Sequence, residues 1–395
     1  MKNLKFDSAI CDLCGKCIED CPFGALCMGN AGIELTAACR MCSVCIKSCP
    51  RGAVYYEQEN DTIDKSLWRD ILVFAEQENG VIHNVTYELI GKARELAAVV
   101  GYRVHALMIG GPGCSESAEE LVQYGVENVY VYEHPGFKYF KADCWANAAA
   151  DCIASISPSV VLVGATPLGR SLTPRLSTRF HTGLTADCTV LDMKEDTDLI
   201  QIRPAFGGNI MAEILITGSR PQFATVRYKI MDTAKPVENA VGNVVLCPVT
   251  DAMIRSGIDV TDVTPIPKAK SIEEEEVLIV AGRGVRDEAG LEMLQELAGC
   301  LGGCLCFTRP MVEAGRGDAA HQIGLSGRTV KPKLIITCGV SGAIQFTSCM
   351  QESECIVAIN SDPAAQIFNV AHYCINDDMN AFVPALLDKL RREEK

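Results

Sequence analysis

Residues 11–22 read CDLCGKCIEDCP, and residues 39–50 read CRMCSVCIKSCP. Both stretches have the spacing C-x-x-C-x-x-C-x-x-x-C, and in both a proline directly follows the fourth cysteine. The second stretch repeats the first after about thirty residues, which is the pattern of an internal duplication. The sequence therefore predicts a small N-terminal domain made of two similar halves.

The spacing of the cysteines indicates what these halves hold. Thiolates three residues apart on a tight loop can reach three corners of one [4Fe–4S] cluster, and the fourth cysteine of the run turns toward the other cluster, as in bacterial ferredoxins with two clusters. We therefore assign one cluster to Cys11, Cys14, Cys17 and Cys49. The other is assigned to Cys39, Cys42, Cys45 and Cys21. Such a domain moves single electrons.

Structural zinc is the alternative, because pairs of the form C-x-x-C also bind zinc. A zinc ion takes four ligands, however, and has no use for a doubled run that ends in Cys-Pro. Zinc without acid-labile sulfide in anaerobically prepared protein would contradict the cluster interpretation.

Composition limits the remaining possibilities. The chain has 395 residues, of which 48% are apolar and 22% charged, so it has room for two or three globular domains. Its net charge of −14 argues against nucleic acid as a partner, because no basic stripe is available to meet phosphates. Residues 1–10 lack an apolar signal segment, and no long apolar run predicts a membrane span. We expect a cytoplasmic protein that docks on other proteins.

Most of the other thirteen of the 21 cysteines are scattered singly, which suits a reducing compartment where thiols act as small apolar side chains. Cys300, Cys304 and Cys306 are the exception, and a third metal site is conceivable there. Their spacing fits no common ligand pattern, so we favour packing.

The remainder of the chain predicts an α/β protein. Residues 57–64 are polar and acidic and are typical of a linker. Short apolar strands then alternate with helical patterns, which favours parallel sheets covered on both faces. Residues 262–276 form a second, charged linker. We therefore expect a ferredoxin-like domain at 1–60 and two doubly wound domains at 66–261 and 277–395.

Three loops of the second domain invite a functional interpretation. Gly110–Gly113 ends a strand but lacks a dinucleotide fingerprint, so a tight turn is favoured. The loop and helix after Gly164 carry Arg170, Arg175 and Arg179, which suit a solvated helix face, an anion site, or contact with a flavin in a partner chain. Residues 203–209 form either a bulged loop near an interface or a turn.

Two glycine-rich loops of the third domain follow strands. Gly282–Gly284 and Ser341–Ala343 offer backbone N–H groups to a pyrophosphate, although such loops are also ordinary turns. Asn360–Pro363 is placed to meet an adenosine, or simply to cap a helix.

Several motifs of the second and third domains belong together. They are Gly164–Arg170, Thr182–Thr189 with Asp187, Arg203–Asn209, Gly282–Gly284, Thr308–Arg309, Gly324–Ser326, Gly339–Gln345, Ile356–Asn360 and Asp378. Over residues 66–395 the chain resembles the α subunit of electron-transferring flavoprotein, and Ser341–Gln345 is the specific part. The cluster domain resembles the extension of electron-bifurcating members of that family, as in the caffeyl-CoA reductase and lactate dehydrogenase complexes.

The resemblance implies one FAD in the C-terminal domain. The positions near the ribityl chain and pyrophosphate are Arg283, Ser341, Gly342 and Ala343. Those that line the flavin are Thr308, Gly324, Leu325, Ser326 and Gln345, with Ile323 and Ile344 beside them. Arg309 matches the arginine beside the ring, where its permanent charge would stabilise a reduced, anionic flavin. The adenosine end matches Asn360, Asp378 and Met379.

The sequence departs from the family pattern at several positions. Phe346 stands where a histidine is usual and cannot donate a hydrogen bond to the flavin pyrimidine edge. Leu325 replaces a glutamine, Ser326 replaces a threonine but keeps the hydroxyl, and Ser348–Met350 replaces Ala-Gly-Met. These departures put the potential of the flavin in doubt.

The resemblance implies a β subunit as partner of the second domain, which has a nucleotide-binding fold but holds no nucleotide of its own. We expect an electron-bifurcating complex that passes electrons from NADH, through a β-subunit FAD and the FAD of this chain, to an acyl-CoA dehydrogenase-like or lactate dehydrogenase-like flavoenzyme. Ferredoxin is the second acceptor, reached through the clusters. One alternative is a non-bifurcating carrier that feeds a dehydrogenase or a quinone-linked partner. The other is that the clusters have no redox role and only stabilise a domain too small to fold without them.

Overall fold

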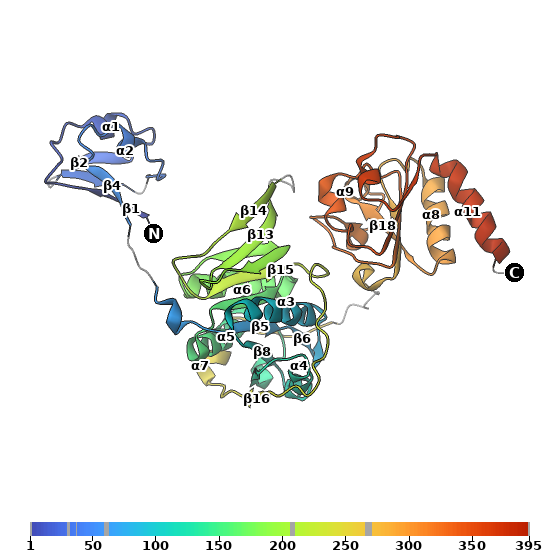
Figure 1. Ribbon diagram of the computed structural model, residues 1–395, viewed down its shortest axis with the longest axis horizontal. Helices are drawn as coiled ribbons and strands as arrows, with labels where there is room; N and C mark the ends of the chain where they lie inside the picture. Colours follow the sequence, from blue (N-terminus) through green and yellow to red (C-terminus); the bar gives the residue numbers. More distant parts are fainter. Residues whose placement is uncertain are drawn as a thin grey trace. The chain divides into compact units, whose positions relative to one another are not determined.

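The computed structural model describes residues 2–29, 32–36, 38–58, 63–205, 210–264 and 271–393. The chain divides into two compact units, Met1–Ile63 and Asp64–Lys395, and each is described by itself. In Figure 1 the first unit is dark to light blue, and the second runs from light blue to red.

The first unit is built from two short helices and two pairs of antiparallel strands. Strand β1 (Lys2–Phe6) pairs with β4 (Val54–Gln58), and β2 (Leu26–Gly29) pairs with β3 (Gly32–Leu35). The helices are α1 (Lys16–Glu19) and α2 (Val44–Ser48). The small core lies between these elements and includes Leu4, Cys17, Leu26, Cys45 and Val54.

The backbone of this unit repeats with a period of 28 residues, as the sequence does. Left-handed φ angles occur at Leu13 (58°) and at its equivalent Met41 (52°), and again at Gly24 (56°) and Gly52 (66°). A third pair of left-handed residues, Gly15 and Ser43, precedes the two helices. Left-handed residues other than glycine are uncommon, so their recurrence at matched positions supports a structural duplication.

The first part of the second unit contains a seven-stranded sheet whose neighbouring strands are all parallel. Its order is β11-β15-β10-β5-β8-β9-β16. The strands are β5 (Ile71–Ala75), β8 (Val104–Gly110), β9 (Asn128–Glu133), β10 (Val160–Gly164), β11 (Leu184–Cys188), β15 (Gln222–Val226) and β16 (Asn243–Leu246).

Helices cover both faces of this sheet (Figure 1). Alternate residues of β5 show why, since Ile71 and Val73 belong to one apolar core and Leu72 and Phe74 to the other. One core includes residues of α3 (Val85–Val100) and α4 (Ala118–Val122). The other includes residues of α5 (Ala142–Ile156), α6 (Pro167–Arg179) and α7 (Asp251–Ile254).

Two small antiparallel sheets accompany the large one. One has three strands, β12 (Val190–Met193), β13 (Leu199–Ala205) and β14 (Ile210–Ile214). The other is the hairpin of β6 (Gln77–Glu78) and β7 (Val81–Ile82).

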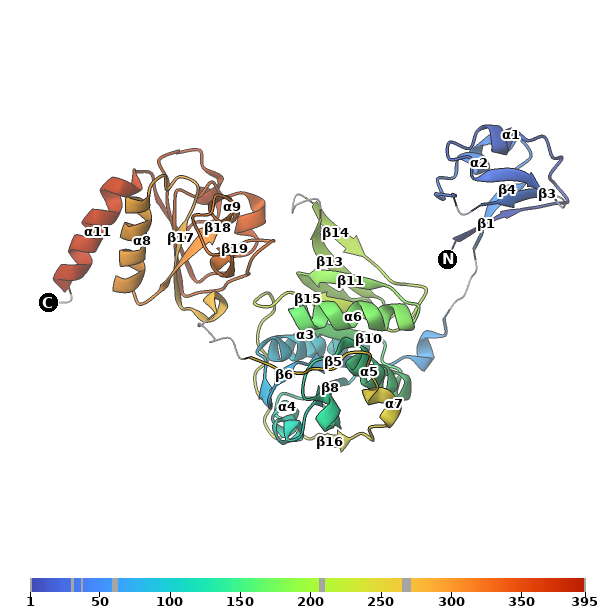
Figure 2. The same cartoon turned by 180° about the vertical axis from the view of Figure 1, so that it is seen from behind.

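The C-terminal part has a six-stranded parallel sheet in the order β19-β18-β17-β20-β21-β22. The strands are β17 (Val277–Ala281), β18 (Cys304–Thr308), β19 (Gln322–Ile323), β20 (Leu334–Cys338), β21 (Cys355–Ile359) and β22 (Tyr373–Ile375). The helices α8 (Glu288–Cys300) and α11 (Met379–Glu393) lie side by side against one face, and both views show them together (Figures 1 and 2). These parallel sheets confirm the predicted α/β class.

Helix α6, which follows the Gly164 loop, begins at Pro167, because the Thr166 side chain accepts a hydrogen bond from the Gly169 N–H and proline suits a first turn. The loop Ser341–Ala343 is followed by the four-residue helix α10 (Ile344–Thr347).

Some expectations lie outside the described residues. They concern positions 59–62 of the first predicted linker, 265–270 of the second, and 206–209 of the loop after Arg203. Within the described part of the chain, no helix is both long and apolar enough to cross a membrane.

Candidate cluster and flavin sites

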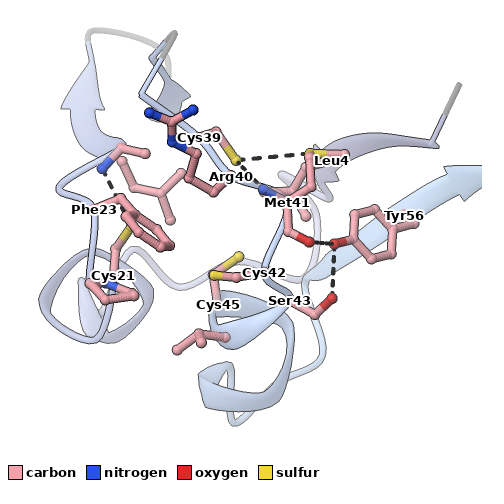
Figure 3. Close-up of a pocket in the computed structure, with 14 residues that line it drawn as sticks. Leu4, Cys21, Phe23, Cys39, Arg40, Met41, Cys42, Ser43, Cys45 and Tyr56 are labelled. Carbon is pink, nitrogen blue, oxygen red and sulfur yellow. Dashed lines mark hydrogen bonds between the residues drawn. The ribbon is translucent and has the colours of Figure 1, made fainter. Parts of the chain in front are cut away.

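Four of the predicted cluster ligands surround one hollow in the first unit. Figure 3 shows Cys21, beyond the end of α1, facing Cys39, Cys42 and Cys45 from the other half of the repeat. The hollow is otherwise mostly apolar, with Leu4, Pro22, Phe23, Ala25, Leu26, Met41 and Val44 in its lining. Four sulfur donors in an apolar surround fit an iron–sulfur cluster, and they are the set that the spacing assigns to one cluster.

Of the second predicted set, Cys17 lies near Cys11 and Cys49. Burial raises the pKa of the Cys17 thiol, and the neighbouring Cys11, Cys49 and Cys45 raise it further. Burial likewise raises the pKa of Cys45, with Cys39 and Cys42 adding to the effect. Because a cluster binds thiolates, loading would release these protons.

Backbone N–H groups point at the fourth cysteine of each run. Cys21 Sγ accepts a hydrogen bond from the Ala25 N–H and Cys49 Sγ from the Ala53 N–H, both at 3.3 Å. Backbone hydrogen bonds lower the pKa of Cys21, and in Cys49 they lower the pKa despite the opposing effect of burial. Both cysteines are thus biased toward the thiolate form that binds iron.

Among the described residues, no three His, Cys, Asp or Glu side chains lie close enough together to hold one metal ion. Cys306 is fully buried and the Cys304 thiol donates to the Leu305 carbonyl at 3.6 Å, which agrees with packing.

In the C-terminal sheet the strand order reverses between β17 and β20, where ligands of such folds bind. The loops that follow these strands touch. The Gly284 N–H donates to the Gly339 carbonyl at 2.9 Å, and a Cβ on Gly282 would lie 2.3 Å from the same oxygen. Only glycine permits this approach, so the predicted phosphate loop is part of a built strand-end site.

A hollow beside these loops brings together three predicted adenosine contacts. It is lined by Gly284, Val285, Arg286, Asp287, Gly290, Gly339, Ile359, Asn360, Ser361, Asp377, Asp378, Met379 and Asn380. Asn360 Nδ2 donates to the Val340 carbonyl at 2.7 Å, and the Asp378 carboxylate accepts from the Asn380 N–H at 2.9 Å. Asp378 therefore caps α11 as well as facing the hollow. Backbone and side-chain polar groups around an open space fit one end of a nucleotide.

The residues predicted to line the flavin are connected in part. The Leu325 N–H donates to the Gln345 carbonyl at 2.9 Å, and Ser326 Oγ accepts from Gln322 Nε2 at 2.8 Å. Gly324 has a φ of 139°, which favours glycine. Ile323 is buried in the core beneath this loop. The segment 323–326 thus lies against Gln345.

The other predicted flavin residues differ in exposure. The exposed ones are Arg283, Arg309, Ser341, Ala343, Ile344 and Gln345. Arg309 Nε pairs with Glu313 Oε1 at 2.7 Å on the surface. Thr308 is buried, and its hydroxyl lies 3.5 Å from the Ala281 carbonyl. These positions are available to a ligand without rearrangement of the core.

Phe346, which replaces the usual histidine, is buried in the apolar core on the face opposite α8 and α11. It packs in the same cluster as Met350 and Ile367. The residue therefore contributes packing to the loop that carries Gln345.

Sequence reasoning missed Arg227, which directly follows β15. Its guanidinium lies 3.4 Å from Asp187 Oδ2 and donates to the Leu325 carbonyl at 3.2 Å. Asp187 also holds Arg170 through two bonds of 3.1 Å, so Arg170 belongs to an ion-pair network and is not merely solvated. The position of Arg227 directly after a strand was the sequence signal that could have identified it.

The chain combines a cysteine-rich N-terminal unit with two parallel α/β sheets, the second of which has a polar hollow beside its strand-order reversal. This arrangement fits a flavoprotein that transfers electrons, and comparison with known proteins identifies its family. The chain matches the models "Electron transfer flavoprotein domain" at residues 71–252, "Electron transfer flavoprotein FAD-binding domain" at 271–351 and "4Fe-4S binding domain" at 3–26. The chain belongs to the electron transfer flavoprotein family and is an α-type subunit.

Three relatives show the extent of the likeness. The chain is 50% identical over 377 residues to the lactate dehydrogenase (NAD(+),ferredoxin) subunit LctC of Acetobacterium woodii, covering 95% of this chain and 90% of the relative. It is 40% identical to the electron transfer flavoprotein subunit alpha of Thermoanaerobacterium thermosaccharolyticum, over 82% of this chain and 98% of the relative. It is 34% identical to the acryloyl-CoA reductase electron transfer subunit beta of Anaerotignum propionicum, over 84% and 98%.

These matches confirm the family predicted from the motifs, an FAD-binding domain and a 4Fe–4S binding domain. The 4Fe–4S match ends at residue 26, so the second run of cysteines, and with it a second cluster, remains a prediction.

Proposed function

We propose that the chain is the α subunit of an electron-bifurcating complex. The complex takes electrons from NADH and passes them to a lactate dehydrogenase-like flavoenzyme and to ferredoxin. The observation that carries this proposal is the presence of an FAD-binding domain and a cysteine-lined cluster domain in one chain. The name of the LctC relative, which joins lactate, NAD(+) and ferredoxin, supports the same acceptors.

The proposal assigns a task to each part of the chain. Residues 1–60 hold two [4Fe–4S] clusters and form the route to ferredoxin. Residues 66–261 pair with a β subunit that carries its own FAD, and residues 277–395 bind the FAD of this chain. The bound flavin accepts and gives up single electrons. The protein supplies the glycine loops for the phosphates, Asn360 and Asp378 at the adenosine end, and the Arg309 charge beside the ring. We place the complex in the cytoplasm.

An acyl-CoA dehydrogenase-like flavoenzyme is the other partner to be considered, because a relative is named as an acryloyl-CoA reductase subunit. The second candidate function is a carrier without bifurcation, and relatives named simply as electron transfer flavoprotein subunits favour it. A β subunit without a second flavin would support that carrier.

The test uses the complex isolated anaerobically through a tag on this chain. Reduction of added ferredoxin by NADH is followed with no acceptor, with pyruvate, and with an enoyl-CoA. We expect ferredoxin reduction only when pyruvate is present. Ferredoxin reduction of equal rate without any acceptor would contradict coupling. Acceptor reduction with ferredoxin left oxidised would instead establish the simple carrier.

A further inference from the structure

The two halves of the cysteine-rich unit are alike in backbone but opposite in charge. Residues 11–28 carry three acidic side chains and one basic side chain, namely Asp12, Glu19, Asp20 and Lys16. The equivalent residues 39–56 carry no acidic side chain and three basic ones, Arg40, Lys47 and Arg51. The two halves thus differ in the sign of their charge, although they keep the same cysteines, left-handed turns and helices. Because Cys21 and Cys49 cross between the halves, the charge beside each cluster is decided by the residues that the structure places there.

The ion pair of Asp12 and Arg51 can be compared with the residues at the two equivalent positions of the repeat. Asp12 Oδ2 of the first half binds Arg51 Nε of the second half at 2.8 Å, so the negative charge of Asp12, which lies between Cys11 and Cys14 in sequence, is balanced. The positions 28 residues away from this pair are occupied by Arg40 and Phe23. Both line the hollow of Cys21, Cys39, Cys42 and Cys45 (Figure 3), and none of the described residues that line this hollow is acidic. The position equivalent to Asp12 is therefore a cation, and the position equivalent to Arg51 is an uncharged aromatic side chain.

The two sets of cysteines also differ in the backbone hydrogen bonds that their sulfurs accept, and among the described residues the set around the hollow accepts more of them. In the set around the hollow, Cys21 Sγ accepts from the Ala25 N–H and Cys39 Sγ from the Met41 N–H at 3.4 Å. In the other set, Cys49 Sγ accepts from the Ala53 N–H. Net charge near a cluster and hydrogen bonds to its sulfurs both set its potential, because the reduced cluster carries one more negative charge.

We propose that Arg40 makes the cluster held by Cys21, Cys39, Cys42 and Cys45 the more easily reduced of the two. The first electron to enter the unit resides at this end. The cluster held by Cys11, Cys14, Cys17 and Cys49 is then the low-potential one. Arg40 is in this sense a potential-setting residue that does not itself bind iron. The inference rests on the proposed content of two clusters.

The test is an anaerobic redox titration of the holo complex followed by electron paramagnetic resonance, after iron and sulfide have been counted. We expect two separate midpoint potentials. Arg40→Gln lowers the higher midpoint and leaves the lower one in place, whereas Arg40→Lys preserves both. The matched change Asp12→Asn, at the equivalent position, raises the lower midpoint. Both neutral variants therefore reduce the difference between the two midpoint potentials, Arg40→Gln by lowering the higher one and Asp12→Asn by raising the lower one.

Two results would overturn the inference. Midpoints that Arg40→Gln leaves unmoved, or shifts together, would show that Arg40 does not distinguish the clusters. Iron and sulfide for only one cluster would instead refute the two-cluster assignment on which the inference rests.

If the Arg40→Gln variant fails to assemble, the two midpoint potentials of the unmodified protein are measured at low and at high salt. Since Arg40 is exposed and salt screens exposed charges, added salt should lower the higher midpoint more than the lower one. Equal displacement of both would contradict the inference.

Discussion

At the scale of single residues, the cysteines give the most direct test of cluster content. Cys42 belongs to the repeated run and lines the hollow, whereas Cys27 lies outside the runs and is exposed. We expect Cys42→Ser to remove about half of the bound iron and sulfide, because one of two clusters loses a ligand. Cys27→Ser should retain the full content. Iron analysis and labile-sulfide analysis of both variants decide the matter, and equal content in the two would refute the assignment of Cys42.

Gly342 tests the loop that is predicted to meet the pyrophosphate. Its φ is 86°, and an added Cβ would lie 2.0 Å from the backbone nitrogen of Ile367. Gly342→Ala should therefore destabilise the C-terminal domain by roughly 1–3 kcal/mol and reduce FAD content. Gly299→Ala is the matched control, because Gly299 lies within α8 and an added Cβ would have open space. Thermal denaturation and the flavin-to-protein ratio are measured on both. If Gly342→Ala keeps both its melting temperature and its flavin content, the loop can adopt a different backbone conformation and the prediction is wrong.

At the scale of elements, helix α3 holds a buried carboxyl that makes stability depend on pH. Glu88 is 3% exposed, and its oxygens accept the Lys229 N–H at 3.0 and 3.2 Å. Burial raises the pKa of Glu88 to about 7, against the opposing effect of these hydrogen bonds. The folded protein therefore binds this proton more tightly than the unfolded chain, whose glutamate has a pKa near 4.5.

The sign of the effect follows from linkage. The contribution of Glu88 is fully present below the unfolded pKa and is lost as the pH rises from about 4.5 to about 7, at ~1.4 kcal/mol for each pKa unit of difference. Glu88→Gln removes this titration. We expect the melting temperature of Glu88→Gln, relative to the unmodified protein, to rise between pH 5 and pH 8. A constant difference across that range would show that Glu88 does not titrate there.

Which elements the sequence predicts depends on how local their causes are. The cysteine runs and the strand–helix alternation are local patterns of a few residues each. The ligand set around Cys42 and the α/β class can therefore be predicted from spacing alone. Glu88 and Arg227 are different, because their partners, Lys229 and Leu325, are more than ninety residues away in sequence. Phe346 could be named as a departure from a motif, but its burial in the core depends on how the whole sheet packs.

At the scale of the molecule, the division at Ile63 and Asp64 predicts that the two units fold independently. Each has its own apolar core. The T. thermosaccharolyticum relative is matched over 98% of its length by only 82% of this chain, so an electron transfer flavoprotein α subunit is complete in fewer residues. We therefore expect a chain that begins at Asp64 to fold, to bind FAD and to associate with the β subunit.

The same truncation tests the electron route to ferredoxin that the proposed function assigns to the cysteine-rich unit. Without residues 1–63 the complex should contain no iron from this chain and should lose NADH-dependent ferredoxin reduction, because the route through the cysteine-rich unit is absent. NADH-dependent reduction of the lactate dehydrogenase-like partner should fall as well, because NADH gives two electrons and the one bound for ferredoxin has lost its acceptor. The measurement compares both activities in the full and the truncated complex, with flavin content as the folding control. If the truncated complex retains its flavin and still reduces ferredoxin at the full rate, the clusters are not the exit, and the unit must instead bring electrons in.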